Sequence, residues 1–140
     1  MNNNSTARFI IIDDDPINNH ICSKYIELAF AGSSTISFTN PQQGLDHIQS
    51  EYSVPKPSGT ILLLDINMPI LSGWEVLDKF KDLPDEIKKQ FRIYILSSSV
   101  AWEDKNTAEN HPLVSGFMEK PISIEQLQKL FPELEHLAFD

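Results

Sequence analysis

Side chains suited to phosphoryl chemistry follow four short apolar runs of this chain. Asp13 and Asp14 come directly after the first run and Asp65 after the second, whereas Ser97 follows the third and Lys120 the fourth. Carboxylates hold divalent cations, a carboxylate can accept a phosphoryl group, and an ammonium group neutralises the charge that arrives with it. The residue types therefore indicate phosphoryl transfer, provided that the fold brings them together.

Strand-like and helix-like stretches alternate along the chain and would position these residues. Strands are expected at residues 8–13, 35–38, 60–65, 91–96 and 114–118, each followed by a helical pattern. Five such units predict an α/β fold, a doubly wound five-stranded parallel sheet with five helices on its two faces. Because the carboxyl ends of parallel strands meet at one edge of the sheet, the polar side chains would share a pocket there.

The first helix is expected to run from Pro16 to about Phe30, with Asp15 as its N-cap. Cys22 is interpreted as a small buried filler. Pro84 is expected to end or kink the third helix, and a short amphipathic remnant of that helix is expected to end at Gln90. The residues expected to face inward from the first helix are Ile17, Ile21, Tyr25, Ile26 and Leu28. The last helix is expected to begin with a capping box of Ser123 and Gln126, and to face inward with Ile124, Leu127, Leu130 and Phe131.

Composition and charge narrow the classes of function. The 140 residues fit one folded domain, expected over residues 8–140 after a disordered N-terminal tail at residues 1–7, with no room for an output domain. The formal net charge of −9, without a Lys or Arg cluster, disfavours nucleic acid as a partner. The apolar runs are too short for a membrane span and no secretory signal is recognisable, so a cytoplasmic location is expected.

Four strings resemble the landmarks of the response-regulator receiver domain, the phosphoacceptor half of two-component signalling. They are IIIDDDPIN, ILLLDINMPILSGWEVL, YILSSSV and GFMEKPI, in the family's order and at suitable distances. The resemblance covers about residues 8–135. It implies a flavodoxin-like sheet with the strand order 2-1-3-4-5, which is one of the common orders of doubly wound sheets.

The same resemblance implies roles for individual residues. Asp65 matches the phosphoacceptor, and Asp13 with Asp14 matches the acidic pair that helps to bind Mg²⁺, Asp14 directly and Asp13 largely through water. Asp65 is also expected to bind the metal, and Asn67 matches the residue whose backbone carbonyl binds it. Three neighbouring carboxylates repel one another, so at least one of their pKa values should be raised when no metal is bound.

Further matches concern the switch. Ser97 matches the switch hydroxyl, Lys120 the lysine that pairs with the phosphoryl group, and Phe117 the aromatic switch residue, where Ser and Phe stand in place of the more frequent Thr and Tyr. Pro121 matches a position that often follows a cis peptide bond. Ser99, like Asn67, occupies a position that influences how fast the phosphoryl group is hydrolysed.

The function implied is a single-domain response regulator that takes a phosphoryl group on Asp65 from a histidine kinase or a histidine phosphotransfer protein. It would not be an enzyme, and it would signal to an unidentified protein through the surface formed by the fourth helix, the fifth strand and the fifth helix. Ile17, Asn18 and His20 are expected to face the kinase.

Two alternatives stay open from the residues alone. An aspartyl-phosphate phosphatase of the haloacid dehalogenase type also places a nucleophilic Asp after a buried strand, but it needs a second acid two residues later, where this chain has Asn67. A receiver-like docking module would bind its partner without phosphorylation.

Overall fold

The computed structural model describes residues 7–98 and 102–131, with side chains described outside 102–104. Five strands and six helices lie in these ranges. In chain order they are β1 (Arg8–Ile12), α1 (Pro16–Ala29), β2 (Ser34–Phe38), α2 (Pro41–Glu51), β3 (Thr60–Asp65), α3 (Gly73–Lys81), α4 (Asp85–Lys88), β4 (Phe91–Ser97), α5 (Trp102–Asn110), β5 (Val114–Glu119) and α6 (Ile124–Leu130).

The strands form one parallel sheet in the order β2-β1-β3-β4-β5, which confirms the predicted fold class and strand order. All six residues of β3 are buried, as expected for an apolar strand that is covered on both faces. β3 therefore holds Asp65, its last residue, at the centre of the sheet's carboxyl edge.

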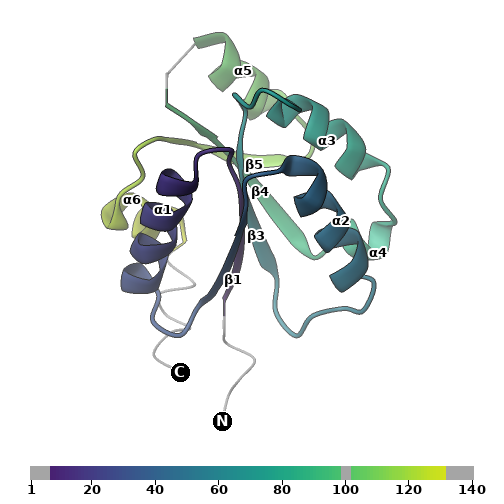
Figure 1. Ribbon diagram of the computed structural model, residues 1–140, viewed down its shortest axis with the longest axis horizontal. Coiled ribbons are helices and arrows are strands. Elements are labelled where there is room, and N and C mark those ends of the chain that lie inside the picture. Colours follow the sequence, from purple (N-terminus) through teal and green to yellow (C-terminus); the bar gives the residue numbers. More distant parts are fainter. Residues whose placement is uncertain (1–6, 99–101, 132–140) are drawn as a thin grey trace.

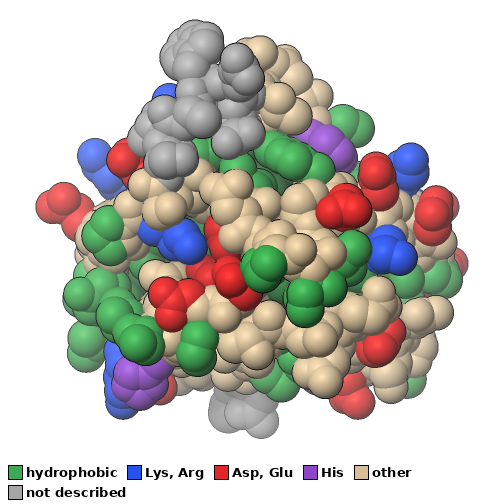
Figure 2. Space-filling model, turned by 45° about the horizontal axis from the view of Figure 1, so that its top comes forward, with side chains coloured by type: hydrophobic (Ala, Val, Ile, Leu, Met, Phe, Trp, Pro, Cys, Tyr) green, Lys and Arg blue, Asp and Glu red, His purple; other side chains and the backbone are tan. Residues whose placement is uncertain are grey.

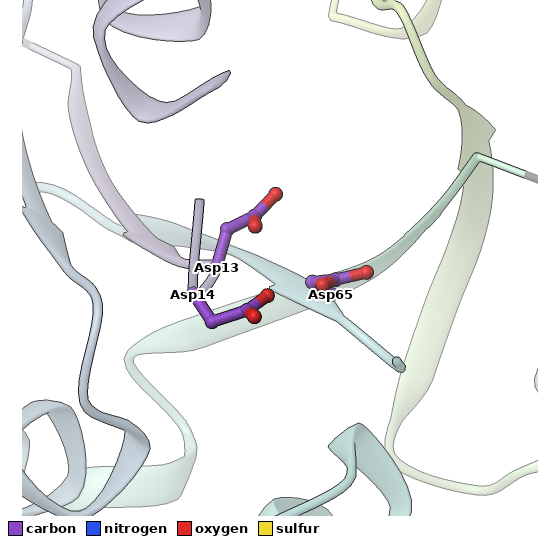
Figure 3. Close-up of side chains that lie close together, drawn as sticks. All are labelled: Asp13, Asp14 and Asp65. Atoms are coloured by element: carbon purple, nitrogen blue, oxygen red, sulfur yellow. The ribbon is translucent and has the colours of Figure 1, made fainter. Parts of the chain in front are cut away.

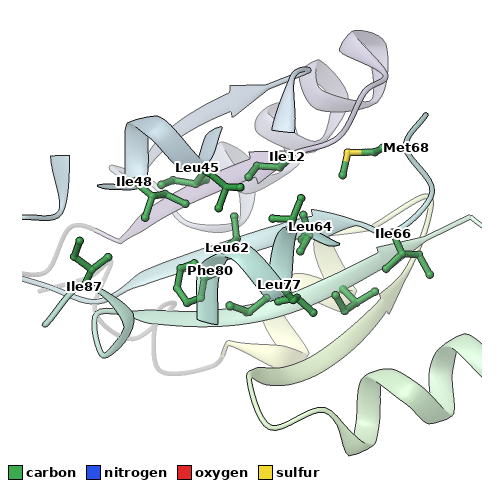
Figure 4. Close-up of a cluster of buried hydrophobic side chains, with 14 of the residues drawn as sticks. Ile12, Leu45, Ile48, Leu62, Leu64, Ile66, Met68, Leu77, Phe80 and Ile87 are labelled. Carbon is green, nitrogen blue, oxygen red and sulfur yellow. The ribbon is translucent and has the colours of Figure 1, made fainter. Parts of the chain in front are cut away.

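Helices cover both faces of the sheet (Figure 1). One face packs against α1 and α6 through a cluster that includes Phe9, Ile26 and Leu127. The other face packs against helices α2 to α5 through a second cluster, which Figure 4 shows around Leu62 and Leu64 of β3. The central strands that carry the candidate site are therefore packed between two separate apolar layers.

The rotation of α1 differs from the prediction. Ile17, Ile21 and Leu28 were expected to face inward, yet they are 71%, 40% and 69% exposed. The face of α1 that meets the sheet carries Asn19, Cys22, Ile26 and Ala29, spaced three or four residues apart as one helical face requires. Of the predicted stripe, Ile26 is buried and Tyr25 packs against the same cluster while partly buried. Asn19 contributes to this rotation, because its side-chain amide donates a hydrogen bond to the Asp13 carbonyl at 2.9 Å. Cys22 is buried as predicted.

A sixth helix, α4, stands where the sequence predicted only an amphipathic remnant. Its four residues follow Pro84, and Ile87 anchors them in the core at 3% exposure. Ser123 caps α6 by accepting a hydrogen bond from the Gln126 backbone amide, which is the Ser123 half of the predicted capping box. The inward stripe of that helix is confirmed, since Leu127 and Phe131 are buried and Ile124 and Leu130 pack against the same cluster.

The N-terminal end and the ends of two strands differ slightly from the predicted bounds. Residues 1–6 of the predicted tail lie outside the described residues, whereas Ala7 is buried and its carbonyl accepts a hydrogen bond from Ser34. β4 and β5 each extend one residue further than predicted, so that Ser97 and Glu119 are paired. No helix in the described part of the chain has the length and apolar character needed to cross a membrane.

Candidate functional site

Three carboxylates converge at the carboxyl edge of the sheet. Asp13 and Asp14 follow β1, and Asp65 ends β3, the neighbouring strand. One carboxylate oxygen of each lies within 4.8 Å of the others (Figure 3). Figure 2 shows acidic side chains near the middle of this face with a basic side chain beside them. Asp13 and Asp65 are buried and Asp14 is exposed, so the group opens to solvent on the Asp14 side.

Lys120 enters this group from the segment after β5. Its ammonium nitrogen lies 2.9 Å from Asp13 Oδ2 and 3.5 Å from Asp65 Oδ1, and its side chain is 13% exposed. The peptide bond between Lys120 and Pro121 is cis, as the sequence pattern predicted. The structure thus brings Asp13, Asp14, Asp65 and Lys120 together as predicted.

Burial dominates the electrostatics of the group, and the predicted repulsion between carboxylates adds to it. Burial, reinforced by the charge of Asp13, raises the pKa of Asp65 to about 6, although Lys120 and the Asn67 amide oppose the shift. Burial alone would lower the pKa of Lys120, but the hydrogen bond and charge of Asp13, together with Asp65, raise it. Burial is the largest influence on the pKa of both groups, and the charges of Asp13, Asp65 and Lys120 act on top of it because two carboxylates share a single ammonium group.

The start of α1 holds Asp13 in place. Asp15 caps the helix as predicted, and its backbone amide donates to Asp13 Oδ1 at 3.0 Å. Asn18 donates from its side chain to Asp13 Oδ2 at 2.8 Å, and Asn19 donates to the Asp13 backbone carbonyl. Sequence reasoning assigned Asn18 to a kinase-facing surface and missed this contact. An Asn in the first turn of a helix directly after an acidic pair was the available signal.

The remaining predicted site residues lie around the carboxylates. Ser97 is fully buried at the end of β4, and its backbone carbonyl accepts a hydrogen bond from the Lys120 amide at 2.7 Å. Asn67 is exposed, and its backbone amide donates a hydrogen bond to Asp65 Oδ1 at 3.4 Å. Phe117 of β5 is partly buried and packs against the cluster beneath α2 to α5. Ser99 lies outside the described residues.

The donor set fits a small divalent cation. Carboxylate oxygens are the hard ligands that Mg²⁺ prefers, and this ion keeps several waters when only a few protein oxygens bind it. The exposed Asp14 leaves room for those waters. No histidine or cysteine joins the carboxylates in the part of the chain that the structure describes, so nothing there favours a softer metal. Burial raises the pKa of Cys22 to about 12, which marks it as an inert thiol.

Comparison with known proteins agrees with this geometry. Residues 9–131 match the family description "Response regulator receiver domain". The chain belongs to this family. Receiver domains are phosphoacceptors in signalling, generally not enzymes, and they bind Mg²⁺ at an acidic pocket. They interact with histidine kinases and downstream effectors.

Solved structures and a curated relative share the receiver fold or sequence. A response regulator receiver protein from Dyadobacter fermentans superposes with a TM-score of 0.82 at 26% identity, covering 92% of this chain and 98% of that one. A two-component response regulator from Cytophaga hutchinsonii gives a TM-score of 0.80 at 28% identity, covering 94% of this chain and 98% of that one.

The nitrate/nitrite response regulator NarL of Escherichia coli K12 is 30% identical over 129 residues. The match covers 92% of this receiver chain and 55% of NarL, so the receiver spans about half the length of that relative.

Proposed function

We propose that this receiver takes a phosphoryl group from the phosphohistidine of a histidine kinase or histidine phosphotransfer protein onto Asp65, in a Mg²⁺-dependent reaction. A carboxylate oxygen of Asp65 would attack phosphorus as the phosphorus–nitrogen bond breaks, and the imidazole would leave with the bonding electron pair. The observation that carries the proposal is the position of Asp65 within 4.8 Å of two further carboxylates and 3.5 Å from the ammonium of Lys120.

Each group has a task in that reaction. Asp65, with a pKa of about 6, is mostly ionised at neutral pH and can act as the nucleophile. Lys120 is already beside it and would pair with an incoming phosphoryl oxygen. Asp14 would bind Mg²⁺ directly, Asp13 largely through water, and Asn67 through its backbone carbonyl. The bound ion would supply the positive charge that offsets the donor phosphate.

Signalling would follow from a rearrangement at the ends of β4 and β5. The Ser97 hydroxyl would move toward the phosphoryl group, and Phe117 would turn inward into the space released. Both residues lie beside the surface formed by α5, β5 and α6, which we propose as the binding surface for a downstream protein. Because α4 was not predicted as a helix, α5 and α6 are the fourth and fifth helices of the sequence prediction. The partly buried Phe117 and the buried Ser97 support this role, because neither can move without displacing its packed neighbours.

The phosphodonor protein would dock on the outer face of α1. Ile17, Ile21 and Leu28 leave large apolar side chains in solvent there. Ile17 lies in the first turn of α1, which begins at Pro16 shortly after the acidic pair, so this end of the face adjoins the site. Exposed apolar groups beside a reactive centre favour a protein partner.

The cytoplasmic location stays a prediction.

The deciding experiment is intact-protein mass spectrometry after incubation with Mg²⁺ and acetyl phosphate. One phosphoryl adduct is expected, absent from Asp65→Asn and from a sample treated with EDTA. A folded, Mg²⁺-supplied protein that gives no adduct would contradict the proposal and favour the phosphorylation-independent docking module. Steady release of phosphate from a phosphomonoester, lost in Asp65→Asn, would favour the phosphatase.

A further inference from the structure

Asn18 lies on the first turn of α1, but its side chain is directed to the acidic site. Its side-chain amide nitrogen lies 2.8 Å from Asp13 Oδ2, and the ammonium nitrogen of Lys120 lies 2.9 Å from the same oxygen. The helix fixes Asn18 in that position, because the Asn18 backbone amide is itself bound to the side chain of the N-cap residue Asp15. Two donors from distant parts of the chain therefore converge on one buried carboxylate oxygen.

We propose that Asn18 is a positioning residue that keeps the Asp13 carboxylate oriented for the metal. This inference rests on the proposed function and adds to it a residue that neither the family's acidic pair nor the switch residues include. It gives Asn18 a role within the site in addition to the predicted kinase contact, which stays a prediction.

The two donors to Asp13 Oδ2 differ in what they do when a phosphoryl group arrives. Lys120 lies between Asp13 and Asp65, so pairing with phosphate on Asp65 draws its ammonium away from Asp13. Asn18 has no such second partner among its described hydrogen bonds and stays on Asp13. The Asp15 amide occupies the other oxygen, Oδ1. Asp13 thus keeps one fixed donor on each oxygen while the lysine moves.

A neutral donor suits this task better than a second cation. A hydrogen bond from an amide orients the carboxylate without cancelling its charge, so Asp13 keeps its attraction for a metal ion. Groups that hold metal-ligating carboxylates in this way commonly change metal affinity by about 10-fold or more when they are removed.

The test compares Asn18→Ala and Asn18→Ser with the wild type by calorimetric titration with Mg²⁺ and by adduct formation from acetyl phosphate, without any kinase. Ser has a helix propensity close to that of Asn, but its hydroxyl is one bond too short to replace the amide. We expect both variants to bind Mg²⁺ about 10-fold more weakly. The Mg²⁺ concentration for half-maximal phosphorylation should rise by about the same factor, while the rate at saturating Mg²⁺ recovers to within about 3-fold.

Gln43→Ala is the matched control. Gln43 occupies the equivalent position in α2, the third residue after an Asx N-cap with a proline first in the helix, but its side chain is exposed and no described hydrogen bond joins it to the three carboxylates. It should bind Mg²⁺ like the wild type, and circular dichroism should show all variants folded.

Wild-type affinity in both Asn18 variants would overturn the inference, as would a wild-type protein that binds no Mg²⁺. If the wild type binds Mg²⁺ but forms no adduct, the proposed function fails, while the calorimetric comparison still decides the role of Asn18.

Discussion

Lys120 and Asp13 form a buried ion pair at 2.9 Å although 107 positions separate them in the chain. Asp13 is completely buried, and Lys120 is the cation that sets the local charge balance against two acids. The pair joins the ends of β1 and β5, strands that are not neighbours in the sheet.

Removing the charge of Lys120 should destabilise the metal-free protein. Lys120→Met leaves Asp13 without its cation beside Asp65, and the free energy of unfolding should fall by about 2–4 kcal/mol. Urea denaturation in EDTA measures this, and added Mg²⁺ should restore part of the loss. Lys88→Met is the control, because its partner Asp85 is exposed and such pairs contribute about 1 kcal/mol or less. Equal effects of the two substitutions would contradict this account of the ion pair.

Asp65→Asn should stabilise the metal-free protein at neutral pH. The pKa of Asp65 is about 6 in the folded state against an ordinary value of 3.8, so ionised Asp65 opposes folding above that range by an amount on the order of 3 kcal/mol. The folded state binds the extra proton between these two pKa values, and the penalty disappears below about pH 4.

The measurement is the difference in unfolding free energy between Asp65→Asn and the wild type in EDTA, from pH 4 to pH 8. The difference should be near zero at the acidic end and should grow as the pH rises to about 7. A difference that is independent of pH would show that Asp65 is not strained by its neighbours.

Substitutions on the two faces of α1 should differ in their effect on the free energy of unfolding, because one face is buried against the sheet and the other is exposed. Ile17→Ala and Leu28→Ala should each change the unfolding free energy by less than about 0.5 kcal/mol, because both side chains are largely exposed. Ile26→Ala removes a fully buried side chain and should lower it by about 2–4 kcal/mol. Urea denaturation decides the matter, and losses of similar size at all three positions would place the apolar stripe inward, as first predicted from the sequence.

Gly73→Ala should disturb the segment that carries Asp65. A Cβ at this position would lie 2.8 Å from the backbone oxygen of Asp65 and 2.8 Å from Ile66 Cα, and neither backbone atom can move aside cheaply. We expect a loss of about 1–3 kcal/mol in unfolding free energy and slower phosphorylation by acetyl phosphate. Gly59→Ala, whose Cβ would meet its nearest atom at an ordinary 3.7 Å, should leave both quantities close to wild type. Parallel denaturation and mass measurements test the pair.

The carboxyl edge of the sheet was predictable because its signals are local in sequence. A buried apolar run ends at Asp65, and the topology of parallel sheets then places this residue beside the ends of the neighbouring strands. The side-chain partners were less predictable. Ser72 and Glu75 form a complete capping box at the start of α3 that the sequence reading passed over, although its Ser-x-x-Glu pattern is visible.

The orientation of α1 could not be read from hydrophobicity. Small or polar residues at 19, 22 and 29 face the sheet because the helix packs there against Phe9 and Ile11, while larger apolar side chains remain outside. Side-chain size and the Asn19 hydrogen bond outweigh apolar content in this helix, and neither has a periodic signature. The contact from Asn18 to Asp13 follows from the same rotation.

The position of each strand in the sheet has a further consequence for hydrogen exchange. Asp65 ends β3, which has neighbours on both sides, whereas Phe117 and the segment leading to Lys120 belong to β5, an edge strand paired only with β4. Amides of an edge strand exchange through local opening, and those of a central strand exchange only when most of the domain unfolds. We therefore expect the slowest amide exchange at β3 and faster exchange at β5. The side of the molecule that reports the phosphoryl group would open before the strand that receives it.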